Sequence, residues 1–129
     1  MQAGTYSIKD GERMALVNMR DLLHRAEAGG WAVGSFSVAN MECIQGVIRA
    51  AEACRAPVIL QIAEVRLPFA PLGLIGPMML AAARRSSVPV AVHLDHGKSL
   101  SCIQEALELG FTSVMCDGRS EEHTSELQS

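Results

Sequence analysis

Three ionisable side chains stand together where an apolar stretch of the sequence ends. Residues 89–99 read PVAVHLDHGKS, in which an apolar run is followed by His93, Asp95 and His96. An imidazole can bind a transition metal or transfer a proton near neutral pH, and a carboxylate can act as a general acid or base. In parallel α/β folds ligands bind at the carboxyl ends of strands, so chemistry is expected at this point of the chain.

The alternation of side chains along a strand decides which of these groups can meet. In a straight strand His93 and Asp95 point to one side, and Leu94 and His96 point to the other. We therefore predict that the strand ends between Asp95 and His96 and that the chain bends at Gly97, which turns His96 toward Asp95. The structural alternative is that His93 hydrogen-bonds a neighbouring strand and Asp95 caps the next helix.

A second acid occupies an equivalent position further along the chain. Asp117 directly follows SVMC, again where an apolar stretch ends. Two acids and a histidine at neighbouring strand ends are typical of metal-assisted hydrolases and lyases. One histidine and one aspartate alone specify a metal only weakly, because zinc takes three or four ligands.

Apolar stretches that resemble strands alternate with stretches of helical periodicity. Helices are predicted at residues 18–28, 41–53, 73–86 and 100–108, and strands at residues 32–38, 57–62, 88–94 and 113–116. The strands are nearly all apolar, which predicts a parallel sheet buried on both faces and built from βαβ units. A (β/α) barrel and a doubly wound sheet both fit this α/β pattern. No GxGxxG follows the first strand, which counts against a dinucleotide fold, and four βα units are half of a barrel.

Composition limits the classes of partner. The chain has 129 residues, 49% of them hydrophobic, and a net charge of -3, as expected for one domain or a piece of one. Without a basic stripe we expect no nucleic-acid partner, and without an apolar run of about 18 residues no membrane span. The four cysteines form no CxxC pair, so we expect free thiols packed as small hydrophobes in a reducing, cytoplasmic compartment.

The two ends of the chain differ from its centre. Residues 1–13 are polar, without a secretory signal, and are predicted to be a disordered extension, with Met14 as a candidate start. Residues 119–129, RSEEHTSELQS, resemble the translation of a sequencing-library adapter and are predicted to be a non-native tail. The predicted domain therefore covers residues 14–118.

Two motifs carry a family resemblance. VPVAVHLDHGKS and GFTSVMCDG resemble the HLDHG and SVMIDGS segments of the class II, zinc-dependent ketose-bisphosphate aldolases, which include fructose- and tagatose-bisphosphate enzymes. GGWAVGSFSVANME and APVILQIAE resemble that family's first strand with its helix and its second strand. The resemblance covers residues 14–118 and implies the N-terminal half of a (β/α)8 TIM barrel.

The resemblance also implies roles for the ionisable residues. Asp95 matches the catalytic acid/base that exchanges the proton of the substrate hydroxyl, and His96 matches the first zinc ligand. Asp117 matches an acid that supports the site or binds a second cation, divalent or monovalent. The implied reaction is the reversible cleavage of a phosphorylated ketose into dihydroxyacetone phosphate, or a similar fragment, and an aldehyde. Lys98 lies past the strand, which disfavours the Schiff-base alternative.

The sequence departs from the family pattern at two expected strand ends. Ser37 stands where many members have asparagine, and Ala63 stands where many have a serine that contacts the substrate. We assign both as substrate-binding positions, and their identities put fructose 1,6-bisphosphate in doubt as the substrate. The segment VRLPFAPLG also lacks the usual glycine-rich loop, and Arg119 replaces the usual serine.

The remaining functional groups of the family are expected after Gly118. The other zinc ligands, the second acid and the phosphate loops would lie there, so this chain is predicted to be inactive. Because its first and fourth strands have unpaired edges, it is also predicted to aggregate or be unstable. The full-length parent is expected to be a homo-oligomer. One alternative is a non-catalytic phosphosugar-binding or partner subunit of the same barrel family. Another is a metal-dependent hydrolase, which would need an HxH pair where Ser35, Phe36 and Ser37 stand.

Overall fold

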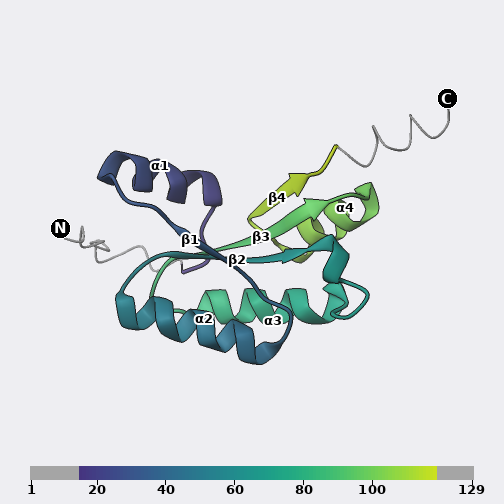
Figure 1. The fold of residues 1–129 in the computed structure, drawn as a ribbon, viewed down its shortest axis with the longest axis horizontal. Coiled ribbons are helices and arrows are strands. Elements are labelled where there is room, and N and C mark those ends of the chain that lie inside the picture. The colour runs from purple at the N-terminus through teal and green to yellow at the C-terminus, as the bar shows by residue number, and fades with distance from the viewer. Residues whose placement is uncertain (1–14, 119–129) are drawn as a thin grey trace.

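The computed structural model describes residues 15–118, which form a four-stranded parallel sheet with helices on its faces (Figure 1). The elements are α1 (Met19–Gly29), β1 (Gly34–Ser37), α2 (Met41–Cys54), β2 (Val58–Ala63), the 3-10 helix η1 (Glu64–Arg66), α3 (Leu72–Arg85), β3 (Val90–Gly97), α4 (Leu100–Leu109) and β4 (Ser113–Cys116). The predicted extension over residues 1–13 and tail over residues 119–129 lie outside the described residues. No helix within residues 15–118 is long and apolar enough to cross a membrane.

Side-chain caps fix where the helices begin. The Asn18 side chain accepts a hydrogen bond from the Arg20 amide at the start of α1, and the Asn40 side chain accepts one from the Cys43 amide at the start of α2. Such a cap satisfies one of the amides that a helix leaves unpaired in its first turn. Both predicted caps are therefore present, and both helices begin where the sequence places them.

The order of the strands distinguishes the two candidate folds. The sheet runs β1-β2-β3-β4, with every neighbouring pair parallel. Helices α2, α3 and α4 pack on one face of this sheet (Figure 1). There Ile48, Met79 and Ala106 join alternate strand residues such as Leu60 and Val92 in one core. A doubly wound sheet would place its crossover helices on both faces. The chain is therefore a partial (β/α) barrel of four units.

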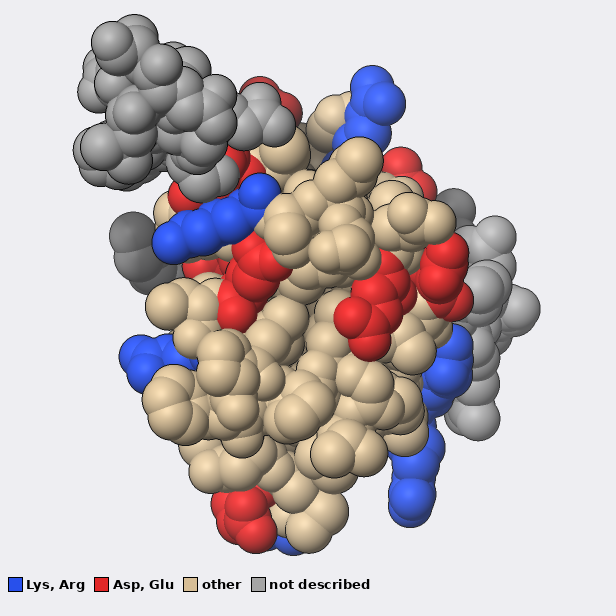
Figure 2. Space-filling model, turned by 90° about the vertical axis from the view of Figure 1, so that its right-hand side faces the viewer, with Lys and Arg blue, Asp and Glu red and all other residues tan. Residues whose placement is uncertain are grey.

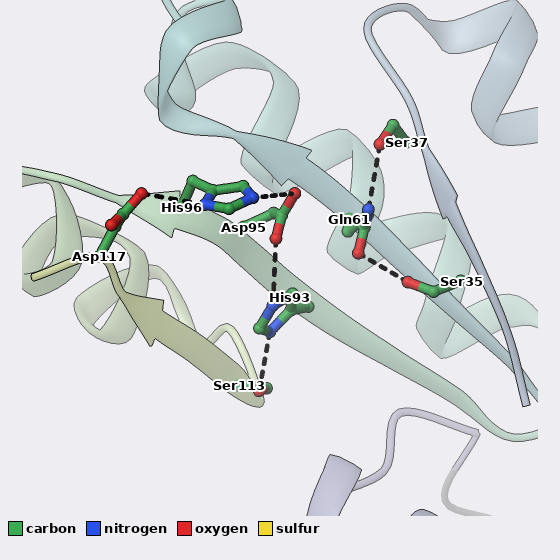
Figure 3. Close-up of polar contacts among 8 residues, drawn as sticks. All are labelled: Ser35, Ser37, Gln61, His93, Asp95, His96, Ser113 and Asp117. Carbon is green, nitrogen blue, oxygen red and sulfur yellow. Dashed lines mark hydrogen bonds and ion pairs between the residues drawn. The ribbon is translucent and has the colours of Figure 1, made fainter. Parts of the chain in front are cut away.

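Helix α1 covers part of the opposite, inner face of the sheet (Figure 1). Leu22 of α1 packs against Ile59 and Ala91, which lie near the amino ends of β2 and β3. Toward the carboxyl ends the same face carries polar side chains, namely Ser37, Gln61, His93, Asp95 and Ser113 (Figure 3). The inner face is thus apolar and covered at one end, and polar and open at the other.

The prediction that every strand is buried on both faces is wrong for β1 and β4. Strands β2 and β3 are mostly buried, but all four residues of β1 are exposed and no residue of β4 is fully buried. β1 is an edge of the sheet, so only β2 pairs with it in the described part of the chain. Apolar patterning alone does not tell an edge strand from a central one.

The cysteines are free thiols, as predicted, but only one of them is packed in the core. Cys102 is buried, whereas Cys43, Cys54 and Cys116 are exposed, so the expected packing is wrong for these three. Burial raises the pKa of Cys102 to about 12, and the charge of Glu64 adds to the effect. The Cys102 thiol therefore stays protonated at neutral pH and is a poor nucleophile.

Candidate active site

Strand β3 does not end where the sequence analysis places its end. It continues to Gly97 with one extra residue, because Leu94 pairs with Val114 but Gly97 pairs with Cys116. His96 takes up this bulge with φ at 47°, in the left-handed region. The bend was predicted at Gly97, but it occurs at His96. A bulge of this kind re-aims a side chain, and a non-glycine residue in such a conformation is held there by its surroundings.

Gly97 is needed for a different reason. A Cβ on Gly97 would lie 2.9 Å from the Met115 carbonyl oxygen and 2.8 Å from Cγ1 of Ile103. The Gly97 carbonyl also accepts a hydrogen bond from the Asp117 amide, at 2.8 Å. The absence of a side chain at Gly97 therefore lets β3 and β4 approach closely just where His96 and Asp117 meet.

The bulge brings His96 between the two predicted acids (Figure 3). His96 Nδ1 lies 3.0 Å from Asp117 Oδ2, and His96 Nε2 lies 3.9 Å from Asp95 Oδ2. An ionised carboxylate only accepts hydrogen bonds, so Nδ1 carries the proton toward Asp117 and the Nε2 lone pair stays available. The His96 side chain is 48% exposed, which leaves this nitrogen open to a ligand.

The structural alternative for these residues is right for His93 and wrong for Asp95. His93 Nδ1 is 2.8 Å from Ser113 Oγ on β4, so His93 does hydrogen-bond a neighbouring strand. Asp95 does not cap the next helix, because Ser99 caps α4 by accepting a hydrogen bond from the Cys102 amide. Instead Asp95 Oδ1 lies 4.0 Å from His93 Nε2. Asp95 therefore lies between two imidazoles, with His93 on its buried side.

His93 should make stability depend on pH. Burial holds the pKa of the His93 ring below its ordinary value of about 6.5, outweighing the attraction of Asp95, and repulsion from His96 lowers it further. Because the unfolded chain binds the proton more readily than the folded chain, protonation of His93 favours unfolding. The contribution of neutral His93 to the free energy of unfolding is therefore complete above about pH 6.5 and is lost as pH falls through the lower folded pKa. Urea unfolding of wild type and His93→Gln between pH 5 and 8 measures how the difference in their free energies of unfolding changes with pH.

The same substitution at the exposed His24 on α1 is the control and should leave the pH dependence unchanged. A constant stability difference between wild type and His93→Gln over this pH range would show that His93 is not responsible.

A row of polar residues crosses the sheet beneath Asp95. Ser37, Gln61, His93 and Ser113 are register partners on four successive strands, and we call them the polar row. The Gln61 amide donates to Ser37 Oγ at 3.1 Å, and Gln61 Oε1 accepts from Ser35 Oγ at 2.7 Å (Figure 3). The predicted substrate residue Ser37 therefore contacts Gln61 rather than Asp95 or His96. Gln61 was not predicted as a site residue, although its signal was a lone polar residue in the apolar PVILQI.

Ala63, the other predicted substrate residue, is the register partner of Asp95. It ends β2 and is partly exposed, one step beyond the polar row. The structure therefore places Ala63 beside the candidate acid/base, whereas Ser37 lies two strands away from it.

Glu64 is a second residue that the sequence analysis missed. Its carboxylate accepts hydrogen bonds from the Lys98 amide and from the amide and hydroxyl of Ser99. Burial raises the pKa of Glu64, but these hydrogen bonds, with that of Ser99 Oγ foremost, outweigh it and leave the pKa below its ordinary value. The signal was a charged residue directly after β2, the same rule that identified Asp95 and Asp117.

The surface around the carboxyl ends of the strands is mostly uncharged. Figure 2 views the molecule from the right of Figure 1, where the strands end, and shows separate groups of acidic and basic side chains on a largely uncharged face. Within residues 15–118, no three or more His, Cys, Asp or Glu side chains gather in a way that could hold a metal ion. The described residues thus supply part of a ligand set and not a complete one.

The fold and the site together define the class of protein. A singly wound parallel sheet with acids and an imidazole converging at the carboxyl ends of adjacent strands is the arrangement of a (β/α)-barrel enzyme. The chain belongs to the family described as fructose-bisphosphate aldolase class-II, which residues 17–128 match. This match continues past Gly118, and the predicted boundary at that residue stays a prediction.

Individual relatives agree with this assignment. The chain is 41% identical over 113 residues to a fructose-bisphosphate aldolase of Thermus caldophilus, covering 88% of the chain and 37% of that protein. It is 42% identical over 110 residues to a 6-phospho-5-dehydro-2-deoxy-D-gluconate aldolase of Halalkalibacterium halodurans, covering 81% of the chain and 38% of that protein. The chain thus spans less than two fifths of the length of these relatives.

A solved structure gives the same result for the fold. The crystal structure of the YdjI aldolase from Escherichia coli K12 superposes with a TM-score of 0.75 at 33% identity, covering 79% of this chain and 39% of that one. The partial barrel described above is therefore similar to part of a known aldolase.

Proposed function

We propose that the full-length protein containing this chain is a zinc-dependent class II aldolase that reversibly cleaves a phosphorylated ketose. The products would be dihydroxyacetone phosphate, or a similar fragment, and an aldehyde. The observation that supports this most directly is the meeting of Asp95, His96 and Asp117 at the carboxyl ends of β3 and β4, made possible by the bulge at His96. A strained conformation at a strand end is typical of a functional site.

Asp95 is proposed to move the proton of the substrate hydroxyl at the bond that breaks. Its side chain is 20% exposed, so a substrate can reach it while His93 and His96 restrict its position. A carboxylate in hydrogen-bond reach of the hydroxyl takes its proton during cleavage and returns it during condensation. No lysine is required for this step, since the electrons of the broken bond are stabilised by a Lewis acid in this class of reaction.

His96 fits the role of a zinc ligand. Its Nδ1 donates to Asp117, which fixes the ring and leaves Nε2 as the metal-binding atom, the arrangement commonly found around zinc-bound histidines. When bound, zinc would polarise the carbonyl and hydroxyl oxygens of the substrate as a Lewis acid. Asp117 is proposed to orient His96 or to bind a second cation, divalent or monovalent.

Ser37 and Ala63 are proposed to face the substrate from β1 and β2. The two relatives above carry names that specify different phosphorylated substrates, which supports a family-wide reaction with a variable substrate pocket. We place the protein in the cytoplasm as a homo-oligomer. Three exposed free cysteines suit a reducing compartment.

The proposal is tested with the full-length protein and a panel of ketose mono- and bisphosphates. Cleavage of at least one substrate, lost with a chelator and regained with zinc, is the expected result. Binding of a phosphosugar without cleavage would instead support a non-catalytic subunit of the same barrel family. Activity that persists after complete metal removal would overturn the zinc-dependent mechanism.

The 129-residue chain itself should bind zinc weakly and cleave nothing. Only His96 is proposed as a zinc ligand here, because Asp95 is the proposed acid/base and Asp117 is bonded to His96 Nδ1, and one ligand falls short of the three or four that zinc requires. We expect a dissociation constant above about 1 μM, which corresponds to a binding free energy weaker than about 8 kcal/mol. Complete structural zinc sites bind with roughly 10 to 16 kcal/mol. Calorimetric zinc titration of wild type, His96→Ala and the control His24→Ala measures it. Tight one-to-one binding with cleavage of a ketose bisphosphate would contradict this expectation.

A further inference from the structure

Glu64 connects two loops that both lie at the carboxyl end of the sheet. It is the first residue of η1, directly after β2, and its side chain reaches the turn between β3 and α4. One oxygen accepts from the Lys98 amide and from the Ser99 amide, the latter at 3.0 Å, and the other accepts from the Ser99 hydroxyl. Three donors from one turn thus converge on one carboxylate.

These bonds hold the turn that follows the candidate active site. Lys98 is two residues after His96, whose left-handed conformation is unfavourable for a residue with a side chain. On the β4 side the bulge is fixed by the hydrogen bond from the Asp117 amide to the Gly97 carbonyl, at 2.8 Å. On the β2 side Glu64 fixes the same turn. The bulge is therefore held from both neighbouring strands.

The charge of Glu64 also suits its position. Ser99 is the N-cap of α4, and its hydroxyl oxygen accepts from the Cys102 amide while its proton is donated to Glu64. A carboxylate near a helix N-terminus is stabilised by the helix dipole, and charge-assisted hydrogen bonds are stronger than neutral ones. Glu64 thus satisfies amides at the start of α4 and orients the capping hydroxyl at the same time.

We propose that Glu64 is a positioning residue, whose carboxylate fixes the β3–α4 turn and thereby places His96 between Asp95 and Asp117. The role of that placement in metal binding and proton transfer rests on the proposed function. The placement itself does not, because it is a property of the folded chain without metal or substrate.

The test is an NMR comparison of the metal-free full-length protein with its Glu64→Gln variant. The carboxamide is uncharged and offers one acceptor oxygen in place of two, so the three donors lose an acceptor and the charge assistance of their hydrogen bonds. Solvent exchange of the Lys98 and Ser99 amide protons should become roughly 10- to 100-fold faster, as expected for charge-assisted hydrogen bonds. The His96 Nδ1 proton, hydrogen-bonded to Asp117, should shift or broaden beyond detection.

Glu42→Gln is the matched control, because Glu42 lies in the first turn of α2 and the change removes the same charge from another helix N-terminus. It should alter neither signal. A merely structural role of Glu64 would lower global stability and leave the His96 proton in place, which would overturn the proposal. If Glu64→Gln does not fold, Glu64→Asp keeps the charge, shortens the side chain and gives the same two readouts.

The full-length protein separates the two proposals. There Glu64→Gln should lower kcat more than it raises KM, because a displaced His96 and Asp95 affect the chemical step. An inactive wild-type protein with the expected NMR changes would refute the proposed function and leave the positioning role standing. An active wild-type protein with unchanged NMR signals in Glu64→Gln would refute the positioning role alone.

Discussion

Asp95→Asn in the full-length protein should lower kcat by roughly 100- to 10,000-fold and change KM little, the range typical for loss of a general acid/base. Asparagine has the same size and can keep contacts to His93 and His96, but it cannot take up the proton of the substrate hydroxyl at neutral pH. Binding of the phosphorylated ketose is therefore preserved while the step that breaks the bond is not. Steady-state kinetics of cleavage and of condensation measure the effect in both directions.

Two controls make this result specific to proton transfer. The zinc content of Asp95→Asn should equal that of wild type, which separates the loss from a loss of metal. Asp21→Asn removes an exposed acid in the first turn of α1 and should leave kcat unchanged. Retention of more than about one tenth of wild-type kcat by Asp95→Asn would show that another group moves the proton.

Gly97→Ala should destabilise the chain by about 1 to 3 kcal/mol, the usual cost of forcing extra atoms into a packed region. The added Cβ would meet the Met115 carbonyl oxygen at 2.9 Å, and this atom is backbone and cannot move without disturbing β4. Displacement of β4 would also lengthen the 3.0 Å contact between His96 and Asp117. Urea unfolding measures the first effect, and the His96 Nδ1 proton signal measures the second.

Gly46→Ala is the matched substitution. Gly46 is exposed on α2 and nothing lies within 4 Å of a Cβ placed there, so alanine should stabilise the helix by up to about 1 kcal/mol. Equal stabilities of Gly97→Ala and Gly46→Ala would mean that β3 and β4 separate easily at this point and that the close approach has no structural importance.

Local patterns in the sequence predicted the elements but not how the strands meet. Asn18 and Asn40 are read directly as caps, and the apolar periodicity placed the four α-helices and the four strands within a few residues but not the short η1. The end of β3 was missed because the bulge exists only through its pairing with β4, about twenty residues later in the chain. The exposure of β1 was missed because edge position is a property of the whole sheet.

The candidate site was predictable where its members stand at the end of an apolar stretch of the sequence. Asp95, His96 and Asp117 are such residues, and the structure brings them together. The partners of Gln61 and Glu64 were not predictable in this way, because their contacts join residues more than twenty positions apart. Their residue types mark them as unusual, but only the register of β1, β2 and β3 shows what they hold in place.

The polar row divides the inner face of the sheet into a region packed under α1 and a region away from that packing. Ile59 and Ala91 lie two residues before Gln61 and His93 on the same strands and are buried under α1, so substitutions there act on stability. Ala63 and Asp95 lie two residues beyond the row, away from that packing. Substitutions at positions such as Ala63 should therefore carry little thermodynamic penalty, and the proposed substrate pocket would open at the carboxyl end of the sheet.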